Sequence, residues 1–356
     1  MPSSGLPSSF GLIFLTGILL KPSVRSRGVN AVLVPPVHGL MGGTAMLRRI
    51  LSALVFIPAV LFAVFETSTG GIVFLGVLLV CSWLTAHEYF DLVGSAFSAG
   101  TRLVGMTAVT CTVCLSFVLG GSLRGAAAAI TGGDISAWPE MANAAGQVAM
   151  ILSLKIFAVV LVFLVGSLLA LFVIQIRRES FDGAFREVGL AFLSIPWIGF
   201  GFGSLAILHA LPGKGPWLVL LAFVVVWVTD SFALFTGKIL GRHRLGLAAS
   251  PNKTVEGTIG GAVFGVLAAA LLKIAFPVAY SGWAMMQWPE FLALALIFSI
   301  AGQVGDLAES VLKRSLGTKD SGRLVPGHGG LLDVFDAQMV VSPLVLGLTI
   351  LLAGAA

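Results

Sequence analysis

The sequence predicts an all-α protein, a polytopic bundle of about nine transmembrane helices. The 356 residues are 57% hydrophobic and only 10% charged, whereas a soluble domain has about 45–50% apolar and about 25% charged residues. The apolar residues also form runs close to the roughly 20 residues that a helix needs to cross a bilayer. A soluble core has no room for so much apolar surface, so we expect an integral membrane protein.

The first 45 residues differ from the rest of the chain. They are rich in Ser, Pro and Gly, and their one apolar stretch, Phe10 to Leu20, is too short to span a membrane. We expect residues 1–45 to be a poorly ordered extension or a segment before the natural start. Residues 46–356 form the expected transmembrane domain, because the segment from Met46, MLRRILSALVFIPAV, resembles a natural beginning.

The apolar runs place the expected helices in order along this domain. They cover residues 49–65, 71–90, 102–121, 147–176, 189–211, 216–238, 257–279, 289–312 and 332–353. The stretch 122–146 could hold an interfacial helix. No internal repeat is visible.

Lysine and arginine set the expected orientation, because cytoplasmic loops carry an excess of both. If the residues before the first span are inside, most of these side chains fall on inner loops. The outer loops and span ends then carry only Arg124, Lys155, Lys214 and Lys273. We therefore expect a multi-pass protein of the inner (cytoplasmic) membrane, with the loops after spans four, six and eight in the cytoplasm. The net charge of +5 is interpreted as topology and attraction to anionic lipid, not as nucleic-acid binding.

Three acidic residues interrupt otherwise apolar spans: Asp230, Asp306 and Glu309. Glu88 closes the second span and is interpreted as a span-end residue. Acids inside a membrane segment usually face a protein interior or water and suggest a functional site. The alternative is a polar group near a span end, in contact with water. Asp306, Glu309, Ser310 and Lys313 follow the spacing i, i+3, i+4 and i+7, which places them on one face of a helix.

Two further carboxylates, Asp333 and Asp336, lie one helical turn apart where the last span begins. Such a pair suits Mg²⁺, which takes a few carboxylates together with water and phosphate oxygens. Helix capping is the alternative, because acids are favoured at helix N-termini. With Asp306 they would form a three-carboxylate metal site at the cytoplasmic edge of the membrane.

Two loops surround these acids with basic side chains and glycines. The loop after span eight carries Lys313, Arg314, Lys319 and Arg323, and its Gly329 and Gly330 follow His328. Glycines allow a backbone to approach a ligand closely and expose N–H donors to phosphate. Basic residues beside a metal site suit a polyphosphate, although positive-inside anchoring also explains them. The loop Gly237 to Gly257 has similar chemistry, with Ser250 and Lys253 in an SPNKT turn.

These residues resemble the integral-membrane phosphatidate cytidylyltransferases, also called CDP-diacylglycerol synthases. The family signature runs S-x-x-K-R, K-D, P-G-H-G-G and D-R-x-D. Here it reads Ser310, Lys313, Arg314, Lys319, Asp320, Pro326 to Gly330, Asp333 and Asp336. The upstream elements D-x-x-A-Y and S-P-x-K-T-x-E-G match Asp230 to Ala233 and Ser250 to Gly257. The resemblance runs from about Met46 to the C-terminus, and places the catalytic part at about 216–345.

Two positions depart from the family pattern. Val334 stands where the family has arginine in D-R-x-D, and Leu234 stands in place of the tyrosine. Loss of the arginine removes a bidentate partner for phosphate or carboxylate. Arg314 or Arg323 would have to compensate.

The resemblance implies that CTP and phosphatidate react to give CDP-diacylglycerol and diphosphate. It implies Mg²⁺ on Asp306, Asp333 and Asp336, a second cation (K⁺) nearby, and a homodimer. Asp306, Lys313, Asp333 and Asp336 would be catalytic. Substrate binding would fall to Asp230, Ser250, Lys253, Ser310, Arg314, Lys319, Asp320, His328, Gly329 and Gly330, with Lys253 at the lipid phosphate.

Two other functions fit part of the sequence. A CTP-dependent polyprenol or phytol kinase would share the metal and the basic loops, but the complete K-D, P-G-H-G-G, D-x-x-D pattern argues against it. A secondary transporter also carries acids within its spans. Its acids should lie near the bilayer midplane, whereas these cluster at one membrane edge.

Overall fold

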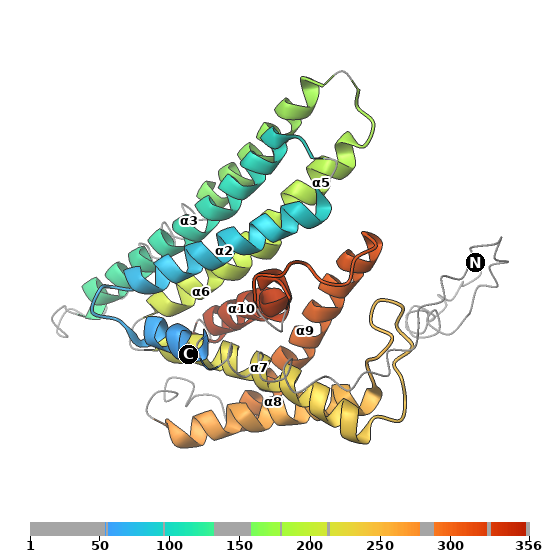
Figure 1. Cartoon of the computed structure of the whole chain (residues 1–356). Helices are drawn as coiled ribbons and strands as arrows, with labels where there is room; N and C mark the ends of the chain where they lie inside the picture. The colour runs from blue at the N-terminus through green and yellow to red at the C-terminus, as the bar shows by residue number, and fades with distance from the viewer. Residues whose placement is uncertain are drawn as a thin grey trace, which may run out of the picture. The chain divides into compact units, whose positions relative to one another are not determined.

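The structure, a computed structural model, describes residues 54, 56–94, 97–131, 158–178, 180–211, 214–277, 288–325 and 329–353. Within these ranges the chain is helical, and its β contacts are two isolated bridges. The helices are α2 (Ile72–Val93), α3 (Ala99–Thr131), α5 (Ala184–Ser194), the π-helix η2 (Ile195–Gly199), α6 (Phe200–Ala210), α7 (Gly215–Leu240), α8 (Val255–Ala275), α9 (Trp288–Ser315) and α10 (Leu331–Ala353) (Figure 1). Two more helices lie at Phe56–Phe65 and Ala158–Ile176.

The prediction of a polytopic helical membrane protein is confirmed. Among the described residues, eight helical segments are long and apolar enough to cross a membrane. They match the second to ninth predicted spans. The first predicted span, 49–65, falls partly outside the described residues, which show a helix at Phe56–Phe65. The predicted extension 1–45 and most of the stretch 122–146 also lie outside them.

Helix α3 is longer than the apolar run that predicts it. Hydropathy gives a span at 102–121, whereas the helix runs from Ala99 to Thr131. The additional residues include the sequence RGAAAAI, and alanine has the highest helix propensity of all residues. The helix therefore continues past the end of the apolar signal.

The predicted span 189–211 is not one regular helix. It consists of α5 and α6 joined by the π-helix Ile195–Gly199. Pro196 lies in this segment, and proline cannot donate the backbone hydrogen bond of a regular turn. Such local breaks in the hydrogen-bond ladder are a recognised cause of kinks and π-bulges. A hydropathy profile does not detect them.

Helix α10 has a central place among the helices that build the site. It contacts α9, α6, α7 and α2, and Figure 1 shows it between α6 and α9. Its residue Phe335 packs against Phe202 of α6, with ring centroids 4.9 Å apart, and against Phe56 at 5.9 Å. Phe335 is buried. This aromatic packing fixes the first turns of α10.

Polar contacts within the bundle fix the rotation of α9. The hydroxyls of Thr229 in α7 and Ser299 in α9 lie 2.9 Å apart. One turn further, the Gln303 side-chain amide donates to the Thr258 carbonyl of α8 at 3.2 Å. Polar side chains between apolar helices hold them in register. The next turn of α9, which carries Asp306, is thereby oriented toward the ends of α7 and α8.

Candidate active site

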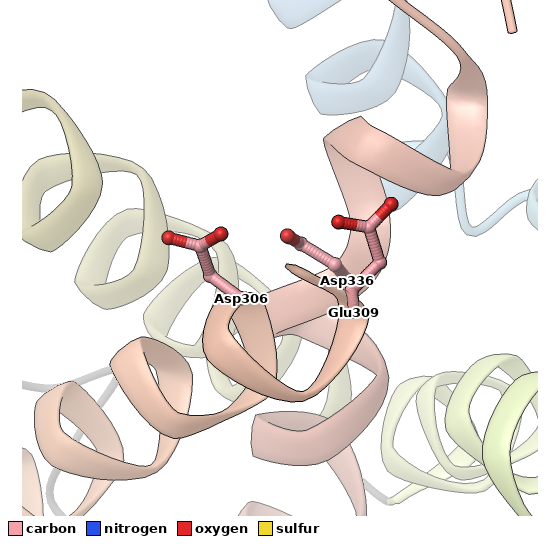
Figure 2. Close-up of side chains that lie close together, drawn as sticks. All are labelled: Asp306, Glu309 and Asp336. Atoms are coloured by element: carbon pink, nitrogen blue, oxygen red, sulfur yellow. The ribbon is translucent and has the colours of Figure 1, made fainter. Parts of the chain in front are cut away.

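Three carboxylates meet where α9 passes the start of α10. Asp306 and Glu309 come from α9 and Asp336 from α10, and one oxygen of each lies within 4.8 Å of the others (Figure 2). Glu309 is 0% exposed and Asp336 is 6% exposed, while Asp306 is half-buried. Carboxylates this close repel one another unless protons or a cation neutralise them. The arrangement therefore has the oxygen-rich chemistry of a divalent-cation site.

Close packing of the two helices brings these groups together. Gly305 of α9 faces the backbone of α10, and a Cβ at this position would lie 3.0 Å from the Asp336 carbonyl oxygen. A larger residue would push the helices apart. On α9 itself, the i, i+3 spacing places Asp306 and Glu309 on neighbouring turns of one face. This is the face that the sequence predicts.

Two lysines contact the carboxylates. Lys313 lies one turn beyond Glu309 on α9, and its Nζ is 2.6 Å from Glu309 Oε2. Lys253 comes from the loop between α7 and α8, and its Nζ is 2.6 Å from Asp306 Oδ2. Asp336 has no ion pair within the described chain. The two ammonium groups thus leave part of the negative charge of the cluster available for a cation.

Asp230 extends the acidic region toward α7. The residue is exposed, and its charge interacts with those of Asp306 and Lys253. Asp336 interacts electrostatically with Asp230 as well as with Asp306. The structure therefore brings the predicted residue Asp230 into the same electrostatic group as the clustered carboxylates.

Asp333, predicted as a metal ligand, is not one of the three clustered carboxylates. Its Oδ1 accepts a hydrogen bond from Lys313 Nζ at 2.6 Å. Its Oδ2 accepts from the Ser321 amide at 3.1 Å, the Ser321 hydroxyl at 2.9 Å and the Gly330 amide at 2.7 Å. In this structure Asp333 caps α10 and orders the preceding loop. Its role as a metal ligand stays a prediction.

The predicted phosphate-binding residues differ in their exposure and in their hydrogen bonds. Ser310 is half-buried on α9, whereas the side chains of Lys319 and Asp320 are exposed. Arg314 donates to the carbonyls of Ala249 at 3.3 Å and Thr318 at 3.1 Å. Arg314 therefore joins the two basic loops. His328 lies outside the described residues.

The backbone amides of the predicted glycine pair donate hydrogen bonds within the protein. The Gly330 N–H donates to Asp333, and the Gly329 N–H donates to the Val325 carbonyl at 3.1 Å. Both amide donors are therefore engaged, and neither is free to bind phosphate in this structure. Substrate binding by this pair stays a prediction.

The loop that carries Ser250 and Lys253 is held by the start of α8. Thr254 caps this helix by accepting the Gly257 amide at 3.1 Å. Glu256 accepts the amides of Arg242 at 3.1 Å and His243 at 3.2 Å. These bonds close the loop, so that the Lys253 amide meets the Ser250 carbonyl at 3.3 Å and the Lys253 side chain reaches Asp306.

Two acidic residues belong to this region without having been assigned to it from the sequence. Glu309 is predicted on the same helical face as Asp306, but not as a member of the metal site. Glu88 of α2 accepts the Leu332 amide at 2.8 Å, although its sequence position suggests only the end of a span. The helical spacing of Glu309 from Asp306 is sufficient to predict that Glu309 belongs to the cluster. Nothing in the sequence predicts the contact between Glu88 and Leu332.

The chain matches the Cytidylyltransferase family over residues 47–352. It is 41% identical to the phosphatidate cytidylyltransferase of Staphylococcus saprophyticus, 40% to that of Staphylococcus haemolyticus and 42% to that of Staphylococcus aureus, each over 161 residues. These alignments cover 45% of this chain and 58% of each relative. Because the family match takes in most of the sequence, this chain belongs to the cytidylyltransferase family.

Proposed function

We propose that this protein is a phosphatidate cytidylyltransferase. It transfers the cytidylyl group of CTP to phosphatidate, which yields CDP-diacylglycerol and diphosphate. Family membership and the names of the relatives support this activity. The structural observation that carries it is the cluster of Asp306, Glu309 and Asp336 beside Lys253 and Lys313. Binding of a polyphosphate substrate requires a metal cation, which acidic residues hold, and basic side chains beside it.

We also propose that the site lies on the cytoplasmic side of a bacterial-type inner membrane. The basic loop 241–254 contacts the end of α9, where Arg314 donates to the Ala249 carbonyl, and positive charge favours the cytoplasmic side. CTP then arrives from the cytosol, and phosphatidate enters from the bilayer. A homodimer stays a prediction from the resemblance.

Asp306, Glu309 and Asp336 fit Mg²⁺ because all three offer carboxylate oxygens and their mutual repulsion needs a positive charge. Both oxygens of Glu309 are buried and lack a hydrogen bond of good geometry, apart from the ion pair with Lys313. When bound, Mg²⁺ would offset negative charge on the phosphates and the leaving group. Asp333 as an additional ligand and a second cation, K⁺, stay predictions.

The reaction needs positioning more than proton transfer. An oxygen of the phosphatidate phosphate attacks the α-phosphorus of CTP, and the bond from that phosphorus to the oxygen bridging to the β-phosphate breaks. The phosphate monoester is already ionised at neutral pH, so no general base is required. Lys253 holds the lipid phosphate, while Lys313, Arg314 and Lys319 hold the triphosphate and stabilise the departing diphosphate. Ser310 lies one turn beyond Asp306, within the same site.

The test is an assay of purified protein in detergent micelles with phosphatidate, Mg²⁺ and CTP labelled at the α-phosphate. We expect label in the lipid product and none with Asp336→Asn. Glu66→Gln, at a half-buried carboxylate outside the site, is the control. Label that reaches lipid only from γ-labelled CTP would identify a lipid kinase instead. Absence of label in lipid when folded protein is given either α-labelled or γ-labelled CTP would overturn the proposal.

A further inference from the structure

Glu88 is a buried acid with no role in the chemistry above. It lies on α2 and is 5% exposed. Its Oε2 accepts the Leu332 amide at 2.8 Å across a sequence separation of 244 residues. Its Oε1 is buried and accepts no hydrogen bond from the described chain. Buried carboxylate oxygens are nearly always paired, and Oε1 of Glu88 is an exception among the described residues.

Two glycines of the loop between α9 and α10 pack against this carboxylate. A Cβ at Gly322 would lie 2.5 Å from Glu88 Oε1, and a Cβ at Gly330 would lie 2.5 Å from Oε2. Real Cβ atoms do not approach oxygen so closely. The carboxylate of Glu88 therefore packs against both glycines, and a Cβ at either position would force it to move; at Gly330 the Ser321 hydroxyl would have to move as well.

The backbone that Glu88 contacts is the backbone that positions two site residues. Leu332 immediately precedes Asp333, and the Gly330 amide donates to Asp333 Oδ2 at 2.7 Å. Asp336 follows one turn later on α10. A shift of the first turn of α10 would therefore move both carboxylates relative to Lys313 and the acids of α9.

We propose that Glu88 is a positioning residue of the active site: its carboxylate holds the backbone that enters α10 and so fixes the direction of Asp333 and Asp336. The role deepens the proposed function and rests on it. Glu88 acts through the backbone and not on the substrates. It also gives the N-terminal half of the chain a direct part in the site, because α2 supplies the anchor for a loop that follows α9.

The first experiment compares Glu88→Ala and Glu88→Gln with the wild-type protein. Glu88→Ala removes the acceptor, and we expect kcat to fall about tenfold or more and the Mg²⁺ concentration for half-maximal rate to rise, as is usual when a group that orients metal ligands is lost. The KM for phosphatidate should not change, because Glu88 does not contact the lipid site. Glu88→Gln keeps an acceptor oxygen for the Leu332 amide and should restore most of the rate. Glu66→Gln is the control.

A second measurement does not depend on activity. Hydrogen–deuterium exchange over residues 329–336 should accelerate in Glu88→Ala and stay slow in Glu88→Gln, while exchange in α7 and α8 is unchanged. If the wild-type protein makes no CDP-diacylglycerol, the proposed function fails, yet this comparison still decides whether Glu88 holds the start of α10.

A double-variant cycle tests the contact with Gly322 itself. Gly322→Ala should impair the wild-type protein strongly and the Glu88→Ala protein much less, because the side chain it meets is gone. Independent, multiplicative effects of the two substitutions would overturn the proposal. Unchanged exchange and unchanged Mg²⁺ dependence in Glu88→Ala would also overturn it, as would a Glu88→Gln protein as defective as Glu88→Ala.

Discussion

The Nζ of Lys253 lies 2.6 Å from Oδ2 of Asp306, so the loop between α7 and α8 is joined directly to the acidic face of α9. Both side chains are partly exposed, at 24% and 34%. An exposed pair of this kind contributes little to stability. In the proposed function its value is chemical, because it places a cation beside the carboxylates.

Lys253→Ala is therefore expected to weaken substrate binding without unfolding the protein. Loss of one charge-assisted hydrogen bond should raise the KM for phosphatidate about tenfold, with little change in Tm. Steady-state kinetics with phosphatidate and CTP varied separately give the measurement. Lys253→Arg keeps the charge and serves as the control. A change in the KM for CTP alone would show that Lys253 binds the nucleotide instead.

Lys313 is expected to matter for stability as well as for activity. It lies 2.6 Å from both Glu309 and Asp333, and these two carboxylates are 0% and 10% exposed. Lys313→Met leaves both without their cation, which should destabilise the protein by about 3 kcal/mol. Thermal unfolding in detergent measures the loss.

A second substitution separates the two roles of Lys313. In the double variant Lys313→Met, Glu309→Gln, one unpaired charge is removed, and Tm should recover in part while activity stays absent. If Lys313→Met unfolds at the wild-type temperature, the ion pairs do not exist in the protein.

Asp336→Asn is expected to raise stability and abolish activity. The substitution removes one of three carboxylates that repel one another, so the metal-free protein should unfold at a higher temperature than wild type in the presence of EDTA. The rate of CDP-diacylglycerol formation should fall at least about 100-fold, because a ligand of the metal is lost. A variant that keeps activity would exclude Asp336 from the site.

Mg²⁺ should stabilise the wild-type protein by binding at the cluster. Binding to the folded state alone adds about 2.7 kcal/mol at a concentration of about 100 times Kd. We expect Tm to rise with added Mg²⁺ in the absence of CTP, and the rise to be absent in Asp336→Asn. An equal rise in both proteins would place the ion elsewhere.

Much of this architecture can be predicted from the sequence because the relevant signals are local. Runs of apolar residues predict the spans, and the i, i+3, i+4, i+7 spacing predicts the shared face of Asp306, Glu309 and Lys313. The local signal fails at the π-helix around Pro196. There the hydrogen-bond ladder changes although the hydropathy does not.

The parts that cannot be predicted depend on contacts between distant segments. Asp333 and Asp336 look equivalent as a carboxylate pair. Only the fold brings the amides of Ser321 and Gly330 to Asp333 while it directs Asp336 toward α9. Glu88 reaches Leu332 across most of the chain, and no residue near Glu88 in the sequence indicates that contact.

The most direct test of the account is the Mg²⁺ dependence of CDP-diacylglycerol formation in the wild-type protein and in Glu309→Gln, with Glu66→Gln as the control. Glu309 is the member of the cluster that the structure adds to the predicted set. We expect wild type and the control to form the lipid with the same Mg²⁺ requirement, and Glu309→Gln to need at least about tenfold more Mg²⁺. A Glu309→Gln protein with the wild-type Mg²⁺ dependence, or folded wild-type protein that forms no CDP-diacylglycerol, would contradict the account.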